Sequence, residues 1–452
     1  MQTKIQKAAI QLSDHFTYKK LLKYTFPAII MMVFSSIYGV VDGFFVSNFA
    51  GTPAFTSVNL IMPFLLILGT VGFMFGTGGG ALIAKTLGQG DKDKANRLFS
   101  LFVYATMALG VVFAALGIAF LRPVTNFLGK NASQEVLDGC ITYGTIILIA
   151  LPFYMLQYEF QSLFATAEKP QLGLFITLAA GIANIILDGL FVGVCDWGLV
   201  GAAVATAISQ AIGGVVPVLY FARKNTSLLK LTKTRFDGKA LVKACSNGAS
   251  ELMSNVSMSL VGMLYNAQLL KLAGDNGVAA YGVLMYVNMI FLACFIGYSV
   301  GTAPVIGFHY GAQNHKELRS LLKKSCILIG IFALVMFAAS ELLASPLAKI
   351  FVRKDKALLD LTVRGFRIFS FSFLFAGFAI FGSSFFTALN DGLTSAIVSF
   401  LRTLVFQVIA VLVFPLLFKG VDGIWWSVVF AESVAVIVNV IFIFAKRGKY
   451  HY

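Results

Sequence analysis

The sequence predicts an all-α integral membrane protein with about twelve transmembrane helices and almost no soluble domain. Hydrophobic residues make up 58% of the 452 residues and charged residues only 12%, which is about half the charged share of an average soluble domain. Apolar runs on the order of 20 residues, long enough to cross a bilayer, recur along the whole chain. These runs show no period-two alternation, so helices are favoured over a membrane β-barrel.

Leu, Ile, Phe and Ala dominate the twelve apolar runs, each of which defines one predicted helix. The helices are expected at residues 21–46, 54–78, 97–120, 138–165, 170–194, 198–222, 247–270, 278–305, 322–344, 365–388, 393–417 and 422–445. With both termini on the cytoplasmic side, about 24 Lys and Arg face inward and about 10 face outward. We therefore expect a multi-pass protein of the inner (plasma) membrane with both termini in the cytoplasm.

The net charge of +15 could suggest a nucleic-acid partner, but the basic residues lie in short connections, as membrane topology requires. No Walker loop, Rossmann fingerprint, zinc-ligand spacing or Ser-His-Asp grouping is present. The five cysteines are scattered and are expected to be small core residues. We expect no enzyme activity, no cofactor and no nucleic-acid partner, and we expect His309 and His315 to lie solvated in a loop.

One long, polar and basic connector divides the chain into halves of six predicted helices each. We take residues 1–222 as the N-terminal lobe, residues 223–246 as a basic cytoplasmic linker, and residues 247–452 as the C-terminal lobe. The basic linker is expected to stay on the inner side of the membrane.

The two halves repeat one another at a nearly constant offset. Gly51 corresponds to Gly274, and Gly78 corresponds to Gly301. Because each half has an even number of helices, both halves insert the same way up, and the repeat is parallel. Two such lobes around a central cavity favour a transporter that works by alternating access.

Acidic residues inside the bilayer are the strongest functional signal, because burying a charge in lipid is costly. Asp42 and Asp188 lie at about the same depth, roughly 8 Å below the outer ends of the first and fifth helices. Asn184 lies one turn deeper than Asp188, and Thr206 in the sixth helix is roughly 12 Å down. These four side chains form a candidate cation site in the first lobe.

Two carboxylates in a low-dielectric region cannot both stay ionised cheaply, so at least one is expected to hold a proton near neutral pH. Alternatively, the two carboxylates with the oxygens of Asn184 and Thr206 suit a desolvated Na⁺. The competing interpretation is that the acids only pair or cap locally, while the amide and hydroxyl join helices. The repeat places Tyr265 opposite Asp42, so ion coupling is expected in the first lobe only.

Other polar residues within the apolar runs have two interpretations each. Arg402 and Glu432 near the midplane form either a structural ion pair, which we favour, or a cavity wall that contacts charged substrate. Glu159 either packs helices or releases a proton on the inner side. Pro27 removes a backbone hydrogen bond and marks either a hinge or a static kink. Glu251 is expected near a helix end.

Motifs spread over nearly the whole chain carry a family resemblance. They are Pro27 followed by Tyr38-Gly39-Val40-Val41-Asp42, then Gly88-Gln89-Gly90-Asp91, Ala183-Asn184-Ile185-Ile186-Leu187-Asp188, and Gly198-Leu199-Val200-Gly201-Ala202-Ala203-Val204-Ala205-Thr206 with its weaker partner Gly420-Val421-Asp422-Gly423-Ile424-Trp425. With them the sequence resembles the MATE family, the multidrug and toxic compound extrusion transporters, and more narrowly its DinF-like prokaryotic branch.

The resemblance implies efflux of small amphipathic, often cationic, compounds in exchange for H⁺ or Na⁺. It implies that Asp42, Asn184, Asp188 and Thr206 form the cation site, with Pro27 at the bend of the first helix. The chain lacks the acid deep in the seventh or tenth helix that is typical of the Na⁺-coupled NorM-like branch, which favours H⁺. We expect a monomer that works within the lipid bilayer.

Two other functions are weighed against this one. A flippase for a lipid-linked oligosaccharide or related lipid precursor would line its cavity with Arg and Lys to hold pyrophosphate, whereas Arg402 is the only deeply placed base here. A passive channel or receptor would need a ring of repeated polar residues, which the sequence lacks.

Overall fold

The computed structural model describes residues 10–130, 132–352, 355–418 and 420–452, and these contain helices and no strands. The first lobe comprises α2 (Tyr18–Phe45), η1 (Val46–Ala50), α3 (Thr52–Gly88), α4 (Lys92–Leu128), α5 (Gln134–Thr166), α6 (Pro170–Asp188), η2 (Gly189–Val194) and α7 (Gly198–Ala222). The second comprises α8 (Gly238–Gly311), α9 (His315–Phe351), α10 (Lys356–Ser370), α11 (Phe373–Ala388), α12 (Gly392–Phe400), η3 (Leu401–Val405), α13 (Phe406–Leu417) and α14 (Val421–Tyr450).

These elements make twelve helices of membrane-spanning length in the described residues. The element α8 consists of two helices that meet at Gly274, where the backbone turns through φ 60° and ψ −152°. A side chain is strained at such a positive φ, so glycine suits this turn. The elements α10 and α11 form one span bent by 51°, and α12, η3 and α13 follow one another without a break. The predicted fold class is therefore confirmed.

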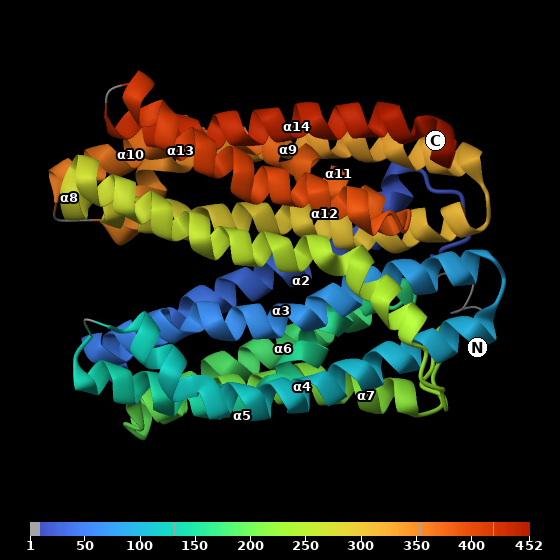
Figure 1. Cartoon of the computed structure of the whole chain (residues 1–452), viewed down its shortest axis with the longest axis horizontal. Coiled ribbons are helices and arrows are strands. Elements are labelled where there is room, and N and C mark those ends of the chain that lie inside the picture. Colours follow the sequence, from blue (N-terminus) through green and yellow to red (C-terminus); the bar gives the residue numbers. More distant parts are fainter. Residues whose placement is uncertain (1–9, 131, 353–354, 419) are drawn as a thin grey trace.

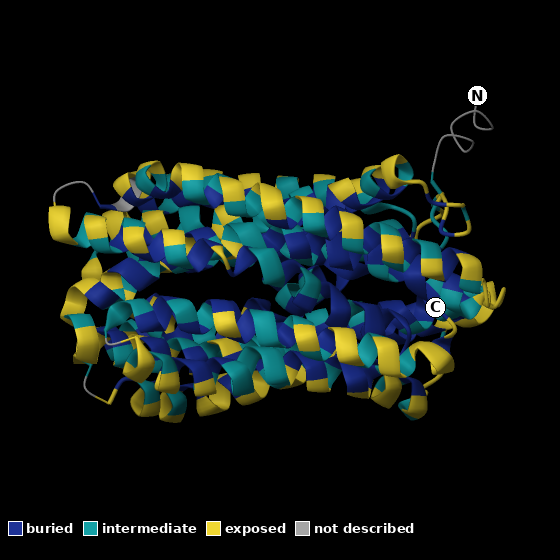
Figure 2. Ribbon diagram, turned by 90° about the horizontal axis from the view of Figure 1, so that it is seen from above, coloured by how far each residue is buried: buried dark blue, intermediate teal, exposed yellow. Residues whose placement is uncertain are grey.

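Figure 1 shows α2 to α7 gathered in one half of the molecule and α8 to α14 in the other. The described N-terminal residues and the C-terminus lie at one end of the bundle, which we call the terminal end (Figure 1). Exposed residues cover the outside of the bundle (Figure 2), and they include large apolar side chains such as Phe120, Phe175 and Phe444. An apolar outer surface of this kind suits a multi-pass membrane protein.

The internal repeat extends to the backbone conformation. The helices α4 and α9 both have 37 residues and lie 223 residues apart in the chain. Positive φ angles recur at matching turns, at Glu168 (57°) and Asn390 (60°), and at Gly198 (53°) and Gly420 (127°). A positive φ is uncommon outside glycine. Its recurrence at Glu168 and Asn390 therefore supports the predicted parallel repeat.

The hydrophobic cores show where the lobes are joined. One cluster near the terminal end contains residues of both lobes, including Phe75 and Phe160 of the first and Tyr298 and Phe385 of the second. Two further clusters lie toward the opposite end, and each is confined to one lobe, within residues 46–203 or 261–425. The lobes therefore share a core at the terminal end and have separate cores at the opposite end.

Glycines allow α3 and α8 to meet at backbone distance in the shared core. A Cβ atom on Gly78 would lie 2.1 Å from the carbonyl oxygen of Ala244. A Cβ atom on Gly248 would lie 2.0 Å from the carbonyl oxygen of Met74. Small residues permit such close helix packing in membranes, so these glycines help to hold the terminal end closed.

We expect Gly78→Ala to destabilise this contact between the lobes by about 1–3 kcal/mol, the usual cost of overpacking. The added methyl group would meet backbone atoms of α8, which cannot move aside independently of the helix. Thermal unfolding of the purified protein in detergent would measure the loss. Gly282→Ala is the matched control, because a Cβ atom there has no neighbour within 4 Å. Equal stability of the two variants would contradict this account of the contact.

The connector between the lobes is shorter than predicted. The helix α7 ends at Ala222, and α8 begins at Gly238 rather than near residue 247. The side chain of Asp237 caps α8, and Lys243 of its second turn donates a hydrogen bond to the carbonyl oxygen of Asn390 at 2.8 Å. These contacts help to hold residues 238–246 in the helix. The division into lobes stays a prediction, and residues 1–9 lie outside the described residues.

Candidate functional site

The first lobe brings Asp42, Asp188 and Thr206 together from three elements. Asp42 lies in the last turn of α2, Asp188 is the final residue of α6, and Thr206 lies in α7. The hydroxyl of Thr206 donates a hydrogen bond to Oδ1 of Asp42 at 3.4 Å. The carboxyl groups of Asp42 and Asp188 lie close enough to interact electrostatically.

Several polar atoms of this group have no hydrogen-bond partner among the described residues. Asp188 is fully buried, and neither of its carboxyl oxygens accepts a hydrogen bond there. Asn184, one turn earlier on α6, is also buried, and its Nδ2 has no acceptor in the described part of the chain. Buried polar groups are normally satisfied, because desolvating an unpaired group costs free energy. The arrangement therefore suits a ligand that the protein binds and releases.

Tyrosines extend the group along α5, with Tyr143 buried and Tyr154 and Tyr158 half-buried, and the sequence analysis did not assign them to it. Tyr143 is buried next to Thr206 and lies within electrostatic range of both carboxyl groups. Farther along α5, the hydroxyl of Tyr154 donates to that of Tyr158 at 3.2 Å. Residues 143, 147, 151, 154 and 158 share one face of a helix. This helical spacing was the signal that could have identified the tyrosine face.

Segments of π-helix adjoin each of the main polar positions. Asp42 precedes η1 by one turn, Asp188 directly precedes η2, and Arg402 lies within η3. Short π-helical segments break the regular hydrogen-bond ladder and are frequent at functional sites. They re-aim the side chains near the end of each helix, which the apolar pattern of the sequence could not predict.

A proton or a monovalent cation fits the first-lobe site. Two adjoining carboxyls in a region of low dielectric favour uptake of one positive charge between them. For Na⁺, the available oxygens would come from Asp42, Asp188, Thr206 and the amide of Asn184. The described residues contain no group of three or more His, Cys, Asp and Glu side chains that could hold a multivalent metal ion.

The corresponding corner of the second lobe is neutral and satisfied. Tyr265, which the repeat aligns with Asp42, donates a hydrogen bond to Gln407 Oε1 at 2.7 Å. Its hydroxyl also lies 2.9 Å from the hydroxyl of Ser427. All three side chains are buried. None of these three side chains carries a carboxyl group, so this position differs in chemistry from the Asp42 position despite the common backbone.

Arg402 and Glu432 form a direct ion pair in the second lobe. Arg402 Nε donates to Glu432 Oε2 at 2.8 Å, and the two side chains are 13% and 9% exposed. In a largely buried pair of this kind, the two charges neutralise each other. Removing either side chain leaves the other charge without its partner, which destabilises the protein. A direct ion pair is the arrangement that the structural interpretation of Arg402 and Glu432 predicts.

Two stretches of the chain match a known protein family. The MatE family matches residues 27–190 and 252–413, one stretch in each lobe and together more than half of the chain. The chain belongs to the MATE family. The family predicted from the motifs is thereby confirmed, and the paired match follows the internal repeat.

Curated relatives of this MATE family chain are multidrug export proteins. A multidrug export protein MepA from Staphylococcus haemolyticus (strain JCSC1435) is 25% identical over 434 residues, covering 96% of this chain and 94% of the relative. The MepA of Staphylococcus aureus (strain MRSA252) is 23% identical over 435 residues, with the same coverage. The alignments therefore run through both lobes.

Solved MATE structures have the same fold. A crystal structure of MATE in complex with MaL6 superposes with a TM-score of 0.92 at 21% identity, covering 97% of this chain and 98% of that chain. An outward-facing conformation of a multidrug resistance MATE family transporter of the MOP superfamily also gives 0.92, at 22% identity, covering 98% and 99%. These similarities establish the MATE fold for this chain.

The remaining predicted residues of this MATE protein are not part of the carboxyl pair. Pro27 is buried within α2, and the helix continues through it. Glu159 is fully buried, and both of its carboxyl oxygens lack a hydrogen-bond partner among the described residues. It lies sixteen residues from Tyr143 on α5, which is roughly 24 Å along the helix axis. A role for either residue stays a prediction.

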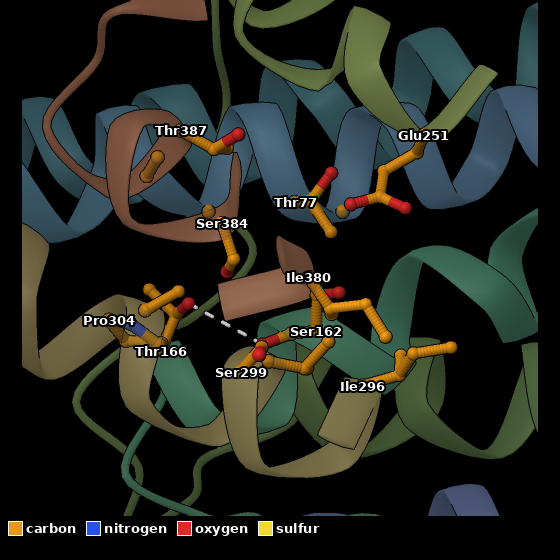
Figure 3. Close-up of a pocket in the computed structure, with 15 residues that line it drawn as sticks. Thr77, Ser162, Thr166, Glu251, Ile296, Ser299, Pro304, Ile380, Ser384 and Thr387 are labelled. Atoms are coloured by element: carbon orange, nitrogen blue, oxygen red, sulfur yellow. Dashed lines mark hydrogen bonds between the residues drawn. The ribbon is translucent and has the colours of Figure 1, made fainter. Parts of the chain in front are cut away.

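The prediction for Glu251 is wrong, because this residue lies well inside a helix. The early start of α8 at Gly238 places Glu251 more than three turns into it. Figure 3 shows Glu251 and Thr77 beside a cavity that is also lined by Ser162 and Ser384, so both lobes contribute. The chain therefore does carry an acid deep in its seventh helix, and the argument that favoured H⁺ over Na⁺ no longer holds.

The prediction of a solvated His309 is also wrong. His309 lies in α8 and is 2% exposed. The ring of Phe16 packs edge-on against it, with ring centroids 6.5 Å apart. No pattern in the sequence indicated that residues before the first helix would cover the end of the eighth.

Proposed function

We propose that this MATE protein exports small amphipathic, often cationic, compounds from the cell in exchange for H⁺ or Na⁺. The pairing of half-buried Asp42 with fully buried Asp188 is the observation that carries this proposal. Multidrug export relatives that align with 96% of the chain support the substrate class. The protein acts as a monomer without a cofactor, and its terminal end faces the cytoplasm.

The exchanged cation binds between the two carboxyl groups of the first lobe. Binding satisfies the unpaired oxygens of Asp188 and competes with the hydrogen bond that Asp42 accepts from Thr206. Because Asp42 is on α2 and Asp188 is on α6, the bound cation draws these two helices together. Release of the cation on the cytoplasmic side resets the pair.

The helix α2 transmits this change to the boundary between the lobes. Asp42 lies near one end of α2, and Pro27 lies fifteen residues earlier. Next to Pro27, the Cα atom of Ile29 would lie only 2.6 Å from a Cβ atom on Gly297 of α8, so the two helices are in tight contact there. A proline lacks the backbone donor that would resist bending. Bending of α2 at Pro27 thereby couples cation binding to rocking of the lobes.

Substrate binds where the lobes face each other, and its affinity must differ between the two states for transport to occur. The acidic Glu251 on the shared cavity suits a cationic compound. Arg402 is engaged by Glu432, so it is not free to hold a pyrophosphate group. The charges at the boundary between the lobes thus favour drug export over the flipping of a lipid-linked precursor.

Membrane vesicles that contain the protein test this function with ethidium as the transported cation. Fluorescence would follow ethidium movement while the pH gradient and the Na⁺ gradient are imposed independently. We expect one gradient to drive export and its collapse to stop export. The driving gradient identifies the exchanged ion. Ethidium export that continues after both gradients are dissipated would refute antiport.

A further inference from the structure

Residues 10–17, which we call the strap, cross the terminal end and contact both lobes. The strap precedes α2 of the first lobe, and Leu12 and Phe16 within it are fully buried. The backbone N–H of Leu12 donates a hydrogen bond to Glu168 Oε1 at 2.7 Å, in the turn between α5 and α6. The strap is therefore fixed to the first lobe by the chain itself and by this bond.

The other contacts of the strap are with the second lobe. The N–H of Phe16 donates to Glu317 Oε1 at 2.9 Å, and His15 Nδ1 lies 2.6 Å from Glu317 Oε2. Lys324 Nζ donates to the carbonyl oxygen of Phe16. Glu317 and Lys324 both belong to α9, and the ring of Phe16 covers His309 of α8. One buried aromatic anchor and one carboxylate thus join the strap to the second lobe.

The position of Glu317 at the start of α9 predicts a helix-capping role, but its side chain does not perform that role. It is the third residue of α9, whose N-cap Asn314 accepts a hydrogen bond from the N–H of Glu317 at 3.1 Å. In a capping box, the glutamate at this position would reach back to the N–H of the cap residue. Here both of its oxygens are directed to His15 and Phe16 instead. The carboxylate is therefore committed to the strap.

The internal repeat supplies a fixed counterpart of the strap. The linker leads into the second lobe and is held by α4 of the first, with Lys230 N donating to Asn96 Oδ1 at 2.9 Å and Thr232 N to Ser100 Oγ at 2.8 Å. The helix α4 is the repeat partner of α9. Each lobe is therefore preceded by a segment held on the other lobe. The linker follows α7 directly in the chain, so it is also covalently attached to the first lobe that holds it. The strap, in contrast, is held on the second lobe only by noncovalent contacts.

We propose that the strap is a releasable latch that holds the terminal end closed. This inference rests on the proposed alternating access, in which the lobes separate at the terminal end. The strap moves with α2, because it is continuous with that helix and bonded to Glu168. Separation of the lobes therefore breaks the contacts of His15 and Phe16 with Glu317 and Lys324. While these contacts last, they favour the state that is closed at the terminal end.

Spin labels on Lys94→Cys of α4 and Arg319→Cys of α9 test the latch in a protein whose native cysteines are replaced. Both positions are exposed at the terminal end, so the distance between the labels increases when that end opens. We expect Glu317→Ala and Phe16→Ala each to raise the ratio of open to closed distances about tenfold, from the loss of hydrogen bonds or apolar burial. Glu135→Ala is the matched control, since Glu135 is an exposed first-turn glutamate of α5 at the opposite end.

A reversible cross-link provides the second arm. A disulfide between His15→Cys and Glu317→Cys is expected to remove the open population and stop ethidium export until a reductant is added. Distances in Glu317→Ala and Phe16→Ala that match those of the parent protein, or full export by the cross-linked protein, would overturn the latch. A parent protein with one distance at every pH and Na⁺ concentration would instead overturn alternating access itself, so the two failures are distinguishable.

Discussion

Asp42→Asn and Asp188→Asn are each expected to reduce gradient-driven ethidium export to the level of vesicles without the protein. Either change leaves one carboxyl group at the site, and an amide cannot take up and release a proton. The remaining carboxyl group also no longer has a second carboxyl group beside it, so its affinity for the cation changes. Export under an imposed pH or Na⁺ gradient is the measurement.

The same substitutions are expected to leave the fold intact. Asp188 is buried with both carboxyl oxygens unpaired among the described residues, so removing its charge does not remove a stabilising bond. The temperature of thermal unfolding at neutral pH should therefore be no lower than in the parent protein. This outcome would separate loss of coupling from loss of structure.

Tyr265→Phe is the control from the second lobe. The repeat aligns Tyr265 with Asp42, and its hydroxyl joins Gln407 and Ser427. Removing this hydroxyl is expected to cost about 1–3 kcal/mol of stability, because two buried groups lose a partner, while coupled export remains. Export that survives unimpaired in both aspartate variants would end the assignment of the cation site.

The helices could be predicted because a bilayer leaves the chain few alternatives. Each span must satisfy its own backbone hydrogen bonds in lipid, so apolar runs define helices directly. The run expected at 198–222 is α7 without change, and the run at 393–417 corresponds to α12, η3 and α13 at 392–417. The helices α3 and α8 extend beyond their predicted limits at the terminal end. Polar residues there are helical because they bond to other parts of the protein rather than to lipid.

The sequence could predict the part of the candidate site that depends on the depth of each residue in the membrane. Counting residues from the helix ends placed Asp42 and Asp188 at one level, and the structure has them adjacent. Depth alone says nothing about which way a helix faces. The tyrosine face of α5, with Tyr143 beside the carboxyls, required the packing of α5 against α7.

Contacts across the boundary between the lobes could not be predicted, because the local sequence pattern predicts different surroundings for the residues that make them. Glu317 reads as a capping-box residue, yet its carboxylate binds the strap. His309 follows an apolar helix and looks solvated, yet Phe16 covers it. In both cases the partner lies about 300 residues away in the chain, and tertiary packing overrides the local preference. Such exceptions are expected at elements that must move.

Arg402→Met is expected to destabilise the protein by about 3–5 kcal/mol, because it leaves the carboxylate of Glu432 buried without its partner. The side chains of the pair are only 13% and 9% exposed, so water cannot replace the lost guanidinium. Chemical unfolding in detergent micelles would measure the change. The double variant Arg402→Met with Glu432→Leu is expected to recover most of the stability, since apolar residues of similar volume often replace a buried ion pair without loss.

The double variant also decides between the two roles of the pair. If the pair only holds η3 to α14, the double variant exports ethidium with unchanged coupling, because no charge is left uncompensated. If the pair contacts substrate, the double variant is stable but loses export, with the cation site of the first lobe intact. We expect the first result. The structural role needs no partner beyond the 2.8 Å bond between the two side chains, whereas a substrate contact would require that bond to open in each cycle.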